Sequence, residues 1–90
     1  MQYVNVRHTV EDYAKWRSGF DAHDSTRRAA GSTGVNHIFR DSGNPNETTT
    51  ILEWDSLDNA RRFVQDPALR EVMKEAGVVG QPEIRFLERA

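Results

Sequence analysis

Apolar positions in the first part of the chain alternate at first and then recur at steps of three and four. Residues 3–8 alternate, with His8 on the same side as two valines, which is the period-2 pattern of a β-strand. Thr9, followed at a helical spacing by Asp12, resembles a capping box and predicts a helix that ends near Ala30. The apolar stripe of this helix consists of Val10, Tyr13, Trp16, Phe20 and His23.

The rest of the chain predicts two strands, a helical region and a last strand. Glycines at both ends of residues 31–34 indicate a turn after the first helix, and residues 41–46 (DSGNPN) are a strong loop signal. Asp66 followed by Pro67 suits the start of a helix, so a second helical segment begins there. The predicted elements are strands at residues 35–41, 48–54 and 83–88 and helices at residues 57–65 and 67–77, with residues 78–82 as a bridge.

This β-α-β-β-α-β order predicts one domain over residues 1–90. Two β-α-β halves of this kind form a ferredoxin-like two-layer sandwich of the α+β class, with a four-stranded antiparallel sheet. Right-handed crossovers place both helices on the same face of that sheet. The other face therefore has no helix to cover it.

The strands nevertheless carry apolar residues on both sides. Val4 lies opposite Tyr3 across the first strand, Leu52 lies opposite Ile51, and Phe86 precedes Leu87. Strands of this kind are typical of sheets that are covered on both faces. A chain of 90 residues also buries only about 60% of its unfolded surface by itself. The pattern therefore predicts a homodimer in which two sheets pack face to face and form an α/β barrel.

Composition excludes several classes of protein. Cysteine is absent, which excludes disulfides, thiolate catalysis and cysteine-based metal sites. The formal net charge of −2, with both signs interspersed, does not suit a nucleic-acid partner. No apolar run approaches the ~18 residues of a membrane span, and we expect no membrane partner and a cytoplasmic location. The third predicted strand lacks the basic and aromatic residues of an RNA-recognition domain.

Three short segments resemble a known superfamily. These are residues 53–55 (EWD), 60–63 (ARRF) and 66–69 (DPAL). With the order of elements, they resemble the dimeric α/β-barrel superfamily, and within it antibiotic-biosynthesis-monooxygenase-like domains and small bacterial "cyclase"-like proteins. The resemblance implies a ligand pocket in each protomer between helices and sheet. It also implies cofactor-independent oxygenase or cyclase-like chemistry on an aromatic or polyketide-type compound.

The haem-degrading branch of that superfamily is excluded by residue identity. Aligned through Glu53 and Trp54, its tryptophan position falls on Phe63 and its histidine position falls on Met73. Asn5 lies near the branch's asparagine position but not clearly on it. Haem would therefore lose its nitrogen ligand, and we expect neither an organic cofactor nor a metal.

The candidate catalytic residues are three histidines with two strand residues. His8, His23 and His37 are the side chains that titrate near neutral pH, and each is expected to face the helix–sheet layer. One of them would act as a base while Asn5 and Arg7, on the opposite side of the first strand, would stabilise an oxyanion. The alternative is structural, with hydrogen-bonded histidines and an ion pair between Arg7 and an acidic residue of the neighbouring strand.

Large apolar side chains supply a candidate ligand-binding surface. They could hold a flat apolar ligand, or they could simply fill the core of a small domain. Two functions remain open at this point, a cofactor-independent enzyme and a dimer that binds a small ligand without catalysis. The candidate ligand-binding residues are Tyr13, Trp16, Phe20, Trp54, Phe63 and Met73.

Overall fold

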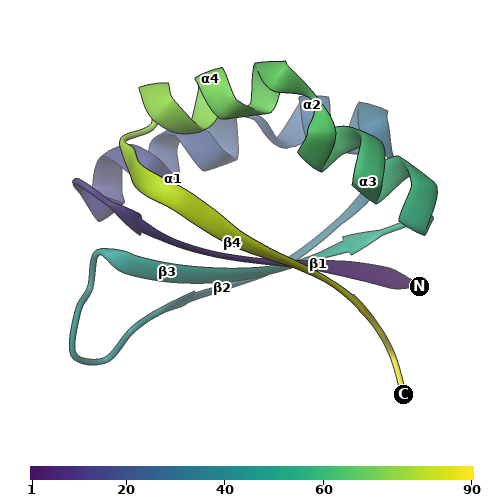
Figure 1. Ribbon diagram of the computed structural model, residues 1–90, viewed down its shortest axis with the longest axis horizontal. Helices are drawn as coiled ribbons and strands as arrows, with labels where there is room; N and C mark the ends of the chain where they lie inside the picture. Colours follow the sequence, from purple (N-terminus) through teal and green to yellow (C-terminus); the bar gives the residue numbers. More distant parts are fainter.

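The structure is a computed structural model that describes residues 1–90 (Figure 1). The predicted order of strands and helical regions is confirmed; the first helical region is divided into two helices, and the second consists of two helices as predicted. The elements are β1 (Gln2–Val10), α1 (Tyr13–Ala22), α2 (Asp24–Ala30), β2 (Ser32–Arg40), β3 (Glu47–Trp54), α3 (Leu57–Gln65), α4 (Pro67–Glu75) and β4 (Val78–Glu88).

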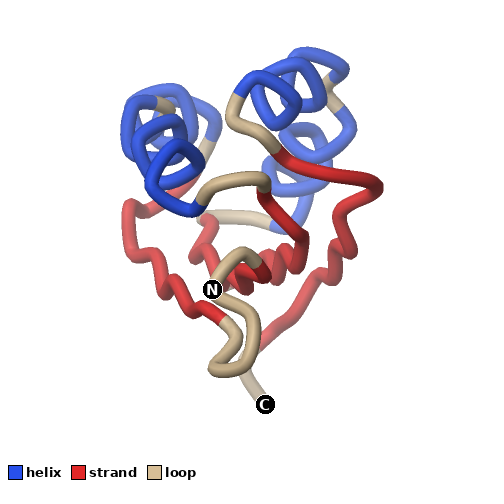
Figure 2. Tube along the Cα trace, turned by 90° about the vertical axis from the view of Figure 1, so that its left-hand side faces the viewer, coloured by secondary structure: helices blue, strands red, loops and turns tan.

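The strands form one antiparallel sheet in the order β2-β3-β1-β4. All helices lie on one face of this sheet, α1 and α2 on one side and α3 and α4 on the other (Figure 2). The sheet curves toward the helices at both edges in the same view. The predicted ferredoxin-like α+β fold is confirmed.

Side-chain caps explain where the second helical region begins and restarts. The Ser56 hydroxyl accepts a hydrogen bond from the backbone N–H of Asn59 at 3.1 Å, which caps α3. The Asp66 carboxylate accepts one from the backbone N–H of Ala68 at 2.9 Å, and Pro67 occupies the first turn of α4. Both boundaries agree with the sequence prediction.

The first helical region ends at Ala30 as predicted, but it differs from its prediction at the start and in the middle. Asp12, not Thr9, caps α1, and its carboxylate accepts a hydrogen bond from the backbone N–H of Ala14 at 3.0 Å. Val10 is a buried residue of β1, because the antiparallel pairing with β4 extends that far. The helix also breaks at His23 (φ −92°, ψ 3°), and α2 restarts at Asp24.

Two strands begin earlier than predicted. β2 starts at Ser32, and its pairing with β3 shifts between Ser32 and Asn36 where Gly34 adopts a φ of +86°. Such a shift is a bulge, and glycine tolerates the left-handed conformation that it needs here. β4 starts at Val78, which pairs with Val10, so residues 78–82 are part of the sheet.

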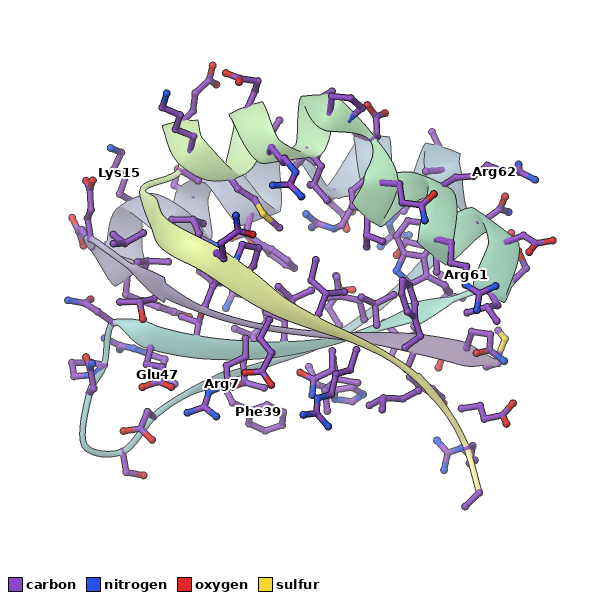
Figure 3. All side chains as sticks on the ribbon, in the orientation of Figure 1. Arg7, Lys15, Phe39, Glu47, Arg61 and Arg62 are labelled. Carbon is purple, nitrogen blue, oxygen red and sulfur yellow. The ribbon has the colours of Figure 1, made fainter.

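The core lies between the sheet and the helices. Its buried centre consists of Val4, Val6, Leu52, Trp54 and Ala60. On the other face of the sheet, Phe39 remains 54% exposed and Val35 remains 45% exposed. Figure 3 shows Arg7, Phe39 and Glu47 on this side, which we call the open face. None of the helices has the length and apolar character needed to cross a membrane.

Candidate functional site

An internal cavity of about 70 Å³ lies between the helices and the sheet. A buried water needs roughly 10–15 Å³ by a comparable measure. The cavity therefore has room for about five or six non-hydrogen atoms, which is one small ring. Seven residues that the sequence singled out line it together: His8, Trp16, Phe20, His23, Trp54, Phe63 and Met73.

His8 is the more deeply buried of the two histidines in the cavity wall. The Thr48 hydroxyl donates to the His8 carbonyl oxygen at 3.3 Å and lies 3.4 Å from His8 Nε2. A hydroxyl has one proton, and Thr48 uses it toward the His8 carbonyl oxygen. In its contact with the imidazole, the Thr48 oxygen must therefore accept the hydrogen bond, and Nε2 must carry the imidazole proton. Nδ1 is then an acceptor, and it is buried without a partner. Burial lowers the pKa of His8 from 6.5 to about 4, so the imidazole is neutral at pH 7.

His23 reaches the same cavity from the junction of α1 and α2. Its ring centroid lies 6.3 Å from that of Phe63, on the opposite pair of helices. Burial lowers the pKa of His23, and the positive charge of Arg27 lowers it further. Its ring is less buried than that of His8. Of the two histidines in the cavity, His23 is therefore the better placed to exchange a proton with a ligand.

Arg27 is a cavity residue that the sequence analysis missed. It lies on α2, is only 4% exposed, and its guanidinium lies 3.7 Å from the centroid of the Phe20 ring. Burial lowers the pKa of Arg27, while the carboxylates of Asp24 and Asp21 act in the opposite direction. A signal was present, because Arg27 continues the helical stripe at four residues from His23.

Aromatic rings form most of the remaining wall. The Trp16 and Phe20 rings have centroids 5.1 Å apart, and the Trp54 and Phe63 rings have centroids 5.0 Å apart. His8 contacts the edge of Trp16 with a centroid distance of 5.4 Å. Distances in this range are typical of attractive aromatic pairs. These side chains fill the core and also line the cavity, and their role in holding a ligand stays a prediction.

Three predicted catalytic residues lie outside this cavity. Asn5, Arg7 and His37 are on the open face, so the expectation that His37 faces the helix layer is wrong. The alternation of β1 puts Asn5 and Arg7 on the face opposite His8, and they cannot share one ligand with it. Arg7 Nε donates to Glu47 on the neighbouring strand at 2.8 Å. The ion-pair interpretation of Arg7 is thus confirmed.

Tyr13 also lies outside the cavity, although its ring is next to Trp16. The guanidinium of Arg40 lies 4.0 Å from the Tyr13 ring centroid, and Arg17 Nη1 donates to the Tyr13 hydroxyl at 3.2 Å. Its position at the start of α1 places it beyond the end of the ring-sized space. No group of three or more histidine, aspartate or glutamate side chains could hold a metal ion.

The arrangement of one curved antiparallel sheet with paired helices on one face is also found in solved structures of other proteins. Similar solved structures agree with it over almost the whole chain. One is a protein of Bordetella bronchiseptica provisionally named an antibiotic biosynthesis monooxygenase, with a TM-score of 0.79 at 17% identity, covering 99% of this chain and 97% of that one. The resemblance that the sequence indicates is therefore confirmed for the fold alone.

Two further structures show the range of the likeness. SnoaB of Streptomyces nogalater, a cofactor-independent oxygenase, has a TM-score of 0.69 at 19% identity, covering 99% of this chain and 91% of that one. A Caulobacter crescentus protein with the same provisional monooxygenase name has a TM-score of 0.73 at 15% identity, covering 99% of this chain and 89% of that one. No protein-family model and no curated protein matches the sequence.

Proposed function

We propose that the protein is a small-molecule enzyme of the cofactor-independent monooxygenase- or cyclase-like kind. The observation that carries the proposal is one apolar cavity, sized for a single ring, with His8 and His23 in its wall. The likeness to SnoaB supports the choice of chemistry, because that protein is a cofactor-independent oxygenase. The substrate is a small aromatic or polyketide-type compound, and the reaction starts with loss of a proton.

His23 is the proposed proton acceptor, and the neutral His8 presents Nδ1 as a hydrogen-bond acceptor that orients the substrate. In an oxygenase reaction the resulting carbanion gives its electron pair to O₂, and protonation yields a hydroperoxide at that carbon. Loss of the second proton of the same CH₂ group, with cleavage of the O–O bond, then leaves a carbonyl and releases the other oxygen atom as water. In a cyclase reaction the carbanion attacks a carbonyl carbon of the same substrate; a carbon–carbon bond forms, the π bond of that carbonyl breaks, and its oxygen takes up the proton that His23 had accepted. Neither route needs a group that the chain does not supply, apart from O₂ in the first.

A substrate panel under air tests this proposal. We expect oxygen consumption or a cyclised product, detected by mass spectrometry, with at least one phenol or diketone of one ring. Replacing the base, His23→Gln, should reduce the rate by about 100-fold or more. His37→Gln on the open face is the matched control and should retain activity. Activity that survives His8→Gln and His23→Gln together would overturn the proposed mechanism.

A non-catalytic ligand-binding function is the second candidate. It is favoured by the lowered pKa of both cavity histidines, because a lowered pKa makes each a weaker base. Binding of panel compounds without turnover under air would select this function. Both candidates use the same cavity.

We also propose that two copies associate through the open face. Phe39, Val35 and Leu87 are 54%, 45% and 38% exposed there, although they are large apolar side chains. They lie on the two edge strands of the sheet, Val35 and Phe39 on β2 and Leu87 on β4. Packing two such faces would remove this apolar surface from water. It would also leave a complete cavity inside each protomer, because the cavity lies on the helix side of the sheet.

A further inference from the structure

Arg27 carries a positive charge in a largely apolar environment, and the ion pair with its nearest carboxylate is a long one. Its side chain is 5% exposed, and the nearest carboxylate oxygen, Oδ1 of Asp24, lies 3.6 Å from Nη2. That distance is too long for a hydrogen bond. The same carboxylate accepts a hydrogen bond from Arg28 Nε at 2.8 Å through its other oxygen, so Asp24 is already engaged. Arg27 Nε is buried and has no partner.

A buried arginine of this kind is costly unless something accepts its hydrogen bonds. The guanidinium of Arg27 uses its face against the Phe20 ring at 3.7 Å. Stacking on the face leaves the in-plane N–H groups free, and these are the groups that bind a carboxylate in bidentate fashion. The N–H groups of Arg27 are therefore oriented so that they can donate hydrogen bonds to an oxyanion.

Arg27 also lies at the wall of the cavity, where its N–H groups can reach a ligand. Arg27 lines the internal cavity and, in addition, a surface groove of about 390 Å³ between α1, α2 and β2. Arg27 therefore lies between the two spaces. A ligand could place its charged end beside Arg27 at the groove and its ring inside the cavity. His23, one helical turn earlier, lines the cavity next to it.

We infer that the cavity binds a small carboxylate whose oxygens accept hydrogen bonds from Arg27 and whose apolar body lies against the aromatic wall. The inference rests on the proposed function in one respect, that the cavity is the ligand site, and it is independent of turnover. It adds the chemical class of the ligand and a binding residue. Benzoate is the simplest compound that fits, since its ring matches the size of the cavity.

The test compares benzoate with benzamide, its neutral analogue of the same shape, by NMR titration of the full chain. Trp16 and Trp54 are the only tryptophans and both line the cavity, so their indole N–H signals report binding. We expect benzoate to bind at least ~10-fold more tightly than benzamide, as charge-assisted hydrogen bonds require. Arg27→Met should remove this preference. Arg62→Met is the matched control and should retain it, because Arg62 is exposed and lines neither the cavity nor the groove.

Each outcome decides the inference. Equal binding of benzoate and benzamide would overturn the carboxylate assignment while leaving the cavity as a ligand site. Shifts with neither compound would overturn both the inference and the proposed function. A benzoate preference that persists in Arg27→Met would show that another group binds the anion. If Arg27→Met does not fold, Arg27→Lys replaces it, and retention of the full preference by that variant would refute a requirement for the bidentate guanidinium.

Discussion

Burial of His8 should make the stability of the protein fall steeply under mildly acidic conditions. The pKa of His8 is about 4 in the folded chain, and the pKa of an unfolded histidine is about 6.5. The unfolded chain therefore binds a proton as pH falls below about 6.5, while the folded chain does not. The stability linked to His8 is complete above pH 6.5 and is lost as pH falls toward 4.

The size of the effect follows from the two pKa values. One pKa unit corresponds to about 1.4 kcal/mol, so the contribution of His8 falls by roughly 3 kcal/mol between pH 7 and pH 4. That is a large part of the ~5–15 kcal/mol typical of a folded domain. Full burial is the physical cause, because His8 is 6% exposed and no carboxylate lies near enough to favour its charged form.

Urea unfolding followed by tryptophan fluorescence measures this contribution at fixed protein concentration. We expect the free energy of unfolding of wild type, minus that of His8→Gln, to decrease by roughly 3 kcal/mol from pH 7 to pH 4. Carboxylates titrate alike in both proteins, so they cancel in the difference. Parallel curves for His8→Gln and wild type would refute the assignment of a buried neutral imidazole.

Three further predictions test the assembly and the fold. Phe39→Asp on the open face should convert the proposed dimer to a monomer, as measured by sedimentation velocity. Arg62→Asp on the helix side should leave the dimer intact. A wild-type protein that sediments as a monomer would contradict the proposed dimer. Trp54→Ala should reduce the free energy of unfolding by about 3–5 kcal/mol, because the side chain is fully buried, and a loss below ~1 kcal/mol would contradict its place in the core. Gly77→Ala should reduce the free energy of unfolding by about 1 kcal/mol or more, because Gly77 has a φ of +87°, which a residue with a Cβ rarely adopts. Gly43→Ala should leave the free energy of unfolding almost unchanged in the same urea assay.

The fold could be predicted because most local signals agree with the tertiary structure. The Ser56 and Asp66 caps mark α3 and α4 directly in the sequence. The predictions failed where pairing between distant segments decides the outcome. Gly80 and Pro82 indicate a turn locally, but pairing of Val78 with Val10 extends β4 through them. The start of β2 was missed for the same reason, because a bulge around Gly34 allows the strand to begin at Ser32.

The candidate site could be predicted only in part. Alternation along β1 places His8 beside Val4 and Val6, so its inward direction follows from the sequence. The direction of His37 does not, because both sides of β2 carry apolar residues and neither is clearly the inner one. Arg27 was missed because an arginine is almost always exposed or paired. Its position on the stripe of α1 and α2 was the one indication that it faces inward.

The sheet separates two sets of polar residues, and this separation limits the chemistry that the cavity can perform. Asn5, Arg7 and two residues of β4 line a polar recess on the open face. They cannot stabilise an anion that forms beside His8 or His23 across the sheet. In the proposed mechanism that role falls to Arg27, the one cation in the cavity wall. Arg27 also lowers the pKa of His23, and a carboxylate bound to Arg27 would offset its positive charge. Ligand binding and the basicity of His23 are then coupled, because the anion that occupies Arg27 makes its neighbouring histidine a stronger base.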